Sequence, residues 1–117
     1  MVVEDDRFLS SLIKARLEKE GLSIIQAFDG EEAINLLRQG KPDLIVLDLI
    51  MPKVSGFEVL ETISLSPQLN KIPVVVLSNL GQDDDIQKAK SLGAAEYFVK
   101  IRVSIDDLIN KVRAIVQ

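Results

Sequence analysis

The stretch that decides the fold is Leu44-Ile45-Val46-Leu47-Asp48-Leu49-Ile50-Met51-Pro52-Lys53-Val54-Ser55-Gly56. Four apolar residues in a row are typical of a strand buried on both faces, as in a parallel sheet covered by helices. A turn follows, marked by Pro52 and Gly56. Because ligands bind outside the carboxyl ends of the strands in open α/β sheets, Asp48 stands where a functional acid is expected. An aspartate that only begins a loop is the alternative.

Segments of strand and helix character alternate along the rest of the chain. Strands are expected over Met1–Val3, Leu22–Phe28 (an edge strand), Leu44–Leu47, Pro73–Leu77 and Ala95–Val99. Helices are expected between Asp6 and Gly21, over Glu31–Gln39 and Phe57–Leu65, from Asp83 to Leu92, and from Ile105 to Val116. This alternation predicts one α/β domain over residues 1–117, a flavodoxin-like three-layer sandwich whose doubly wound parallel sheet has the strand order 2-1-3-4-5.

The composition excludes several classes of function. The net charge is −4 and the basic residues are scattered, so nucleic acid is not expected as a direct partner. No apolar run is long enough to span a membrane. The absence of cysteine fits a cytoplasmic location. The absence of histidine removes the commonest general base. Without histidine or cysteine ligands, any metal must be held by oxygen, which favours Mg²⁺, with Mn²⁺ as an alternative.

Polar residues stand at the ends of four of the five expected strands: Glu4 and Asp5, Asp48, Ser78, and Lys100. In the order 2-1-3-4-5 these four strands are consecutive neighbours, so their carboxyl ends share one edge of the sheet. Three carboxylates and one lysine leave a charge of −2, which one divalent cation balances. A carboxylate beside such a cation can attack phosphorus, so the set predicts an aspartyl-phosphate site.

Taken singly, several of these residues have simpler explanations. Ser78 could cap the helix after Gly81, and Lys100 could be a solvated surface lysine. Tyr97 could be a half-buried packing residue. The acidic run Asp83–Asp85 suits the first turn of a helix without any metal.

The chain resembles the receiver domains of bacterial two-component response regulators over essentially its whole length, including stand-alone members of the chemotaxis-regulator type. The residues that carry the resemblance are Glu4-Asp5, Asp48 with Leu49-Ile50-Met51-Pro52 and Gly56, Ser78, Tyr97 and Lys100. The resemblance implies that Asp48 accepts a phosphoryl group from the phosphohistidine of a sensor histidine kinase or a histidine phosphotransfer protein. It implies Mg²⁺ bound by Asp5, Asp48 and the Ile50 carbonyl, with Glu4 acting through water.

The resemblance also implies an output step. Ser78 would move toward the phosphoryl group while Tyr97 turns inward, which changes the surface of the fourth helix, fifth strand and fifth helix for a downstream protein. A phosphorylation-dependent homodimer is compatible with this scheme. The sequence leaves open whether the protein is a stand-alone switch or one domain of a longer regulator.

The sequence departs from the family pattern at three places. Ile101 follows Lys100 where relatives usually have proline, often in a cis bond. Since a cis bond before a non-proline residue costs about 2.5–4 kcal/mol, we expect a trans Lys100–Ile101 peptide and a changed course for the loop. Asn79 stands where the family favours a very small residue, and we expect its side chain to narrow the access of phosphodonors to the site. Ile50 and Leu80 replace polar residues that position water in some relatives, so we expect slow self-dephosphorylation.

Three other functions compete with the phosphoacceptor switch. A haloacid-dehalogenase-type phosphohydrolase also uses a strand-end aspartate, but it needs an acid two residues later, where Ile50 stands. A pseudo-receiver that only binds partners does not need the acidic pair, Asp48 and Lys100. A flavodoxin-like electron carrier lacks a good aromatic pair here for its flavin.

Overall fold

The computed structural model describes residues 1–116, and in these residues five parallel strands form one sheet of order β2-β1-β3-β4-β5. In chain order the elements are β1 (Val2–Val3), α1 (Arg7–Glu18), β2 (Gln26–Ala27), α2 (Gly30–Gln39), β3 (Ile45–Leu47), α3 (Gly56–Leu65), β4 (Val74–Ser78), α4 (Asp83–Ser91), β5 (Glu96–Val99), the 3₁₀ turn η1 (Lys100–Arg102) and α5 (Ile105–Val116). The predicted fold class and strand order are confirmed.

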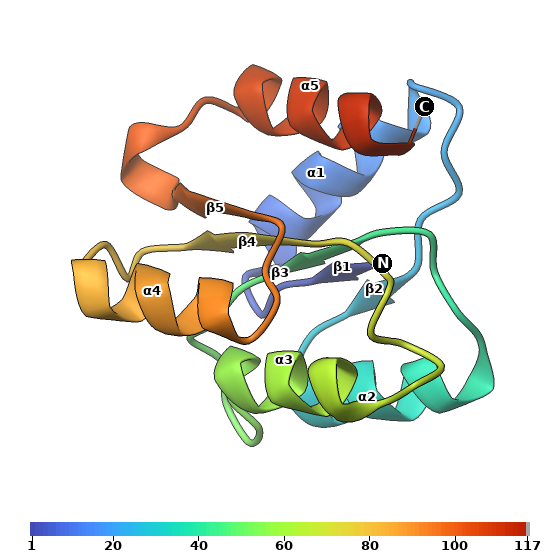
Figure 1. Ribbon diagram of the computed structural model, residues 1–117. Coiled ribbons are helices and arrows are strands. Elements are labelled where there is room, and N and C mark those ends of the chain that lie inside the picture. The colour runs from blue at the N-terminus through green and yellow to red at the C-terminus, as the bar shows by residue number, and fades with distance from the viewer. Residues whose placement is uncertain (117) are drawn as a thin grey trace.

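The sheet is the middle of three layers (Figure 1). Helices α1 and α5 cover one face, and α2, α3 and α4 cover the other. Side chains alternate along each strand, so Ile45 and Leu47 of β3 pack under α2 and α3, whereas Val46 packs under α1 and α5. The continuous apolar runs predicted for β3 and β4 therefore reflect burial on both faces.

The edge strand is shorter than the sequence predicts. A strand was expected over Leu22–Phe28, but β2 contains only Gln26–Ala27. Its partner β1 offers two residues, with Val2 opposite Gln26 and Val3 opposite Ala27. An outer strand can pair only as far as its inner neighbour extends, which is why β2 ends so early.

Side chains cap the starts of α1 and α3 on the edge of the sheet where the strands end. The Asp6 side chain accepts a hydrogen bond from the Leu9 amide at 3.1 Å at the start of α1, and Ser55 caps α3. Asp83–Asp85 form the first turn of α4, where acids favour the helix dipole. Within residues 1–116, no helix is long and apolar enough to cross a membrane.

Candidate functional site

Three carboxylates meet at the carboxyl ends of β1 and β3. Glu4 and Asp5 follow β1, Asp48 follows β3, and these two strands are neighbours in the sheet. Each of the three side chains offers an oxygen, and these oxygens lie within 4.8 Å of one another. Glu4 and Asp48 are buried, whereas Asp5 is exposed. The structure thus brings together all three acids that the sequence predicted.

Lys100 supplies the cation of this cluster from the opposite side of β4. Its Nζ donates a hydrogen bond of 3.0 Å to Oδ2 of Asp48. It also lies 2.7 Å from Oε1 of Glu4, as an ion pair without the alignment of a hydrogen bond. Burial opposes the lysine charge, but pairing with both carboxylates outweighs it and holds the pKa of Lys100 above its usual range. Lys100 is therefore a charged member of the site and not a solvated surface lysine.

The carboxyl group of Glu4 has a raised pKa. Burial raises the pKa of Glu4 from 4.5 to about 7, against the opposing effect of Lys100 and with a further contribution from the charge of Asp48. Its other oxygen, Oε2, accepts a hydrogen bond from the Asp6 amide at 3.1 Å. The cluster gathers three carboxylates around one lysine, so a divalent cation would complete the charge balance when these acids are ionised.

The loop after β3, residues 49–55, is called the acceptor loop below. The Ile50 amide donates to Oδ1 of Asp48 at 3.2 Å, and the Gly56 amide donates to the Leu49 carbonyl at 3.0 Å. A Cβ atom placed on Gly56 would lie 2.1 Å from the backbone oxygen of Asp48. Gly56 is therefore required by the close approach of α3 to the end of β3.

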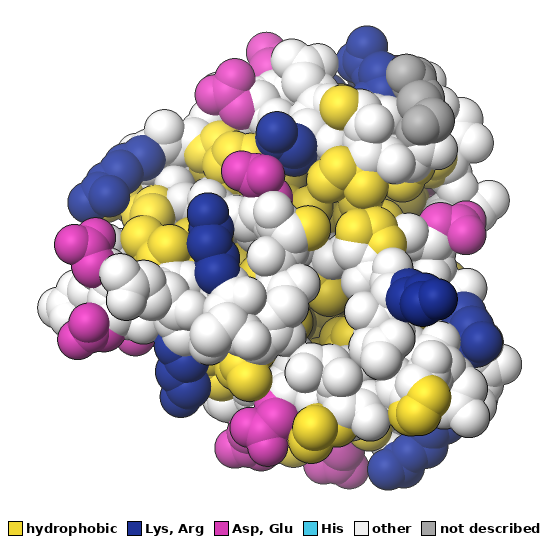
Figure 2. Space-filling model, viewed as in Figure 1, with side chains coloured by type: hydrophobic (Ala, Val, Ile, Leu, Met, Phe, Trp, Pro, Cys, Tyr) yellow, Lys and Arg dark blue, Asp and Glu magenta, His cyan; other side chains and the backbone are white. Residues whose placement is uncertain are grey.

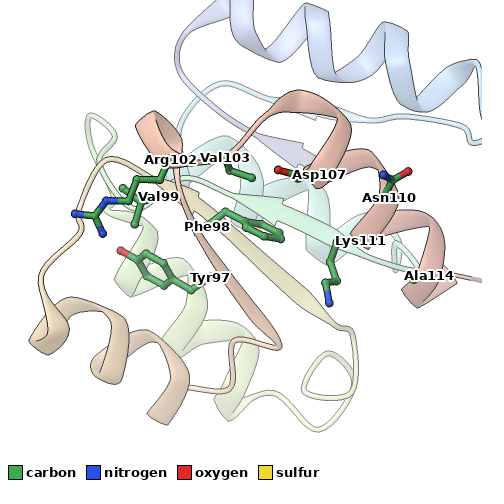
Figure 3. A pocket seen from close by; sticks show the side chains of 9 residues that line it. All are labelled: Tyr97, Phe98, Val99, Arg102, Val103, Asp107, Asn110, Lys111 and Ala114. Carbon is green, nitrogen blue, oxygen red and sulfur yellow. The ribbon is translucent and has the colours of Figure 1, made fainter.

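Ser78 and Tyr97 flank the site on the side of α4. Ser78 is fully buried at the end of β4, and its Oγ accepts a hydrogen bond from the Leu80 amide at 3.3 Å. It does not cap α4, because the residue at that position is Gln82. The Tyr97 hydroxyl donates to the Leu80 carbonyl at 2.5 Å, so its ring lies over the β4–α4 loop. Figure 3 shows Tyr97 and Phe98 extending from β5 in different directions, with Arg102 reaching above the Tyr97 ring.

A family model described as the response regulator receiver domain matches residues 1–113. The chain belongs to this family. Its relatives include YcbL of Bacillus subtilis (strain 168), described as an uncharacterized transcriptional regulatory protein, which is 38% identical over 118 residues that cover 100% of this chain and 50% of YcbL. The chain spans about half the length of the curated relatives it matches.

Two solved response regulators are similar in both sequence and structure. The Mn²⁺-bound form of Rcp1 is 35% identical to this chain with a TM-score of 0.83, and the match covers 97% of this chain and 88% of the Rcp1 chain. The phosphorylated cyanobacterial phytochrome response regulator RcpA is 36% identical with a TM-score of 0.81, and the match covers 97% of this chain and 87% of the RcpA chain.

The structure shows where this receiver domain places the residues that depart from the family pattern. The Lys100–Ile101 peptide is trans, as predicted, and no peptide bond within residues 1–116 is cis. The Ile101 side chain is 82% exposed on the 3₁₀ turn. Asn79 is exposed beside the buried Ser78, and Ile50 is 52% exposed. The expectations about access and dephosphorylation stay predictions.

The start of α2 touches the acceptor loop, which the sequence did not predict. Gly30 lies against the backbone of Val54, and Asp29 lies 3.6 Å from the ammonium of Lys53. The dipeptide Asp29-Gly30 indicates a turn, but a turn signal does not say what the turn packs against.

Proposed function

We propose that this receiver domain is a phosphoacceptor switch of a two-component phosphorelay, in which Asp48 takes a phosphoryl group from a phosphohistidine. The observation that carries the proposal is the environment of Asp48, a buried carboxylate that pairs with Lys100 and is grouped with Glu4 and Asp5. The phosphorylated structure of RcpA supports this assignment for a relative of similar fold.

A hard divalent cation fits the donor set of this site. The donors would be Asp5, Asp48 and the Ile50 carbonyl, with Glu4 acting through water, and all of them are oxygen atoms as Mg²⁺ and Mn²⁺ prefer. The Glu4 carboxylate is buried and already pairs with Lys100 through Oε1, so it is placed to reach the ion only through a bridging water. When bound, the metal would neutralise charge that develops on the phosphoryl oxygens. The Mn²⁺-bound form of Rcp1 supports this choice of ion.

The protein residues have distinct roles in the transfer. An Asp48 oxygen forms a bond to phosphorus while the phosphorus–nitrogen bond of the donor histidine breaks and the nitrogen keeps the electron pair. Lys100, already 3.0 Å from Asp48, stabilises negative charge on the transferred group. Ser78 would then donate its hydroxyl to the new phosphoryl group.

The output would pass through the surface formed by α4, β5 and α5. Tyr97 would turn with the movement of Ser78 and alter this surface for a downstream protein effector. Acidic and basic side chains are interspersed on the face drawn in Figure 2, which favours a protein over nucleic acid as the direct partner. The proposal includes a cytoplasmic location, a sensor kinase or phosphotransfer protein as the donor, and a homodimer as one form of output.

The test is phosphorylation by a small phosphodonor, such as acetyl phosphate, with Mg²⁺ and detection by intact mass. The wild type should gain one phosphoryl group, and Asp48→Asn should gain none. Asp83→Asn is the matched control, since Asp83 is an acid of the α4 first turn outside the site. An unmodified wild type would favour a pseudo-receiver, and continuous release of phosphate would favour a phosphohydrolase. Loss of the acyl phosphate within seconds would contradict the expected slow self-dephosphorylation.

A further inference from the structure

Two glycines approach the backbone of the acceptor loop and of Asp48 too closely for a side chain. A Cβ atom on Gly56 would lie 2.1 Å from the backbone oxygen of Asp48, and one on Gly30 would lie 2.1 Å from the backbone oxygen of Val54. Both contacts are with backbone, which cannot yield as a flexible side chain can. Gly56 belongs to the helix that follows the loop, whereas Gly30 belongs to α2, which is separate from the loop in sequence.

The start of α2 also contacts the residue before Val54. Lys53 has a φ of 67°, the single positive φ outside glycine among residues 1–116. A residue with a Cβ atom adopts this left-handed conformation only when its surroundings impose it. The Lys53 ammonium lies 3.6 Å from Oδ2 of Asp29, the residue that caps α2 by accepting a hydrogen bond from the Glu32 amide. The same helix start therefore contacts both Lys53 and Val54.

A shift of Val54 would be passed toward the site. On its carboxyl side the loop cannot adjust, because Gly56 is wedged against the backbone of Asp48. On its amino side the chain runs back through Lys53 to Pro52, whose φ is fixed by its ring. Met51 then connects it to Ile50, whose amide donates a hydrogen bond to the Asp48 carboxylate. Displacement at Val54 would thus move Ile50 and the side chain to which it is bonded.

We infer that the start of α2, Asp29 and Gly30, is the support that sets the position of the acceptor loop, and that Gly30 is a positioning residue for the metal and for Asp48. The inference rests on the proposed function. In this view Gly30, which lies outside the site, must be glycine because a side chain there would separate α2 from Val54.

The test compares alanine substitutions at the two ends of α2. Gly30→Ala introduces the clash with Val54, whereas a Cβ atom on Gly40 meets nothing within 4 Å, and its extended φ of −174° suits any residue. Mg²⁺ affinity is measured by calorimetry, with Mn²⁺ affinity by electron paramagnetic resonance as a second probe. Gly30→Ala should bind the ion about tenfold more weakly, as is typical when a residue that orients metal ligands is changed. Gly40→Ala should bind like the wild type.

Circular dichroism and urea unfolding establish that each variant is folded, so that altered affinity is separated from lost structure. A folded Gly30→Ala with wild-type affinity would overturn the inference while the proposed function stands. A wild type that neither binds Mg²⁺ nor takes a phosphoryl group would overturn the proposed function, and this inference with it.

If Gly30→Ala does not fold, the variant Lys53→Gly tests the inference instead. Glycine adopts the left-handed conformation freely and loses the contact with Asp29, so the loop should become less ordered. The substitution also removes a positive charge, which alone would favour cation binding. Weaker Mg²⁺ binding by about threefold would support positioning by the α2 start. Equal or tighter binding would overturn it.

Discussion

The acceptor loop and the 3₁₀ turn that carries Lys100 face each other across the site, but they are held in different ways. The acceptor loop is fixed by backbone contacts, with Gly30 and Gly56 each leaving no room for a Cβ atom. The turn is tied to the site through the Lys100 ammonium, which pairs with Glu4 and Asp48. Its next residue, Ile101, is 82% exposed.

This difference teaches where the sequence of a receiver domain can vary. Backbone contacts require a particular residue at a particular place, because their tolerance is a fraction of an ångström. An ion pair at the end of a long side chain can be reached from more than one backbone path. Ile101 can therefore stand where relatives usually have proline, and the peptide before it is trans without loss of the Lys100 contacts.

The largest expected effect comes from filling the space at Gly56. Gly56→Ala should lower the free energy of unfolding by about 3 kcal/mol, because the added methyl group forces α3 away from the end of β3. Urea unfolding followed by circular dichroism measures the change. Gly81→Ala is the control, since its Cβ would meet the nearest side chain at an ordinary 3.5 Å. Equal stability of the two variants would contradict backbone control of the loop.

Removal of the lysine charge should have the next largest effect. Lys100→Met leaves Glu4 and Asp48 without their cation, and we expect a loss of about 2 kcal/mol in unfolding free energy near pH 8 without Mg²⁺. Lys111→Met is the matched control, because Lys111 is 3.8 Å from Glu96 in a more exposed pair, and it should change stability by less than about 0.5 kcal/mol. Comparable losses in both variants would argue against a special role for the Lys100 charge.

The pH dependence tests how incomplete this charge balance is. The pKa of Glu4 is raised from 4.5 to about 7 in the folded state. Between these two pH values, Glu4 keeps its proton in the folded protein but releases it in the unfolded chain. This group therefore contributes most to stability below pH 4.5, and its contribution is lost as the pH rises to about 7.

Glu4→Gln removes that loss. Measured with a chelator present, the variant should gain stability relative to the wild type, on the order of 1 kcal/mol, between about pH 5 and pH 8. Parallel pH curves for the two proteins would show that Glu4 titrates normally.

The smallest effect is expected on the exposed side of the turn. Ile101→Ser should change the unfolding free energy by no more than about 0.5 kcal/mol, because the side chain packs against little. Mg²⁺ affinity should also be unchanged, since the Lys100 ammonium keeps its partners. A large loss of either property would show that the turn, like the acceptor loop, depends on the residue at this place.

Much of the fold could be predicted because the central strands are continuous apolar runs that can be recognised in the sequence. The runs before Asp48 and Ser78 are apolar on both faces of the sheet, and β3 and β4 are found there. The edge strand was predicted too long, since the length of β2 is set by β1 and not by the character of Leu22–Phe28. A strand's own residues do not report how far its neighbour extends.

The site followed from the topology, because parallel strands bring their carboxyl ends to one edge. The sequence therefore predicted that Glu4, Asp48 and Lys100 come together, and they do. Packing between distant backbone segments carries no such signal. Nothing in the sequence pairs Gly30 with Val54, since glycine in a turn is equally explained by the turn itself.

The bond from the Tyr97 hydroxyl to the Leu80 carbonyl has a practical consequence. The chain contains one tyrosine and no tryptophan, so all of its intrinsic ultraviolet emission beyond that of phenylalanine originates from this ring. Tyr97 of β5 is thus an intrinsic optical reporter of its contact with the β4–α4 loop. Any event that frees the phenol can be followed in real time without attaching a dye.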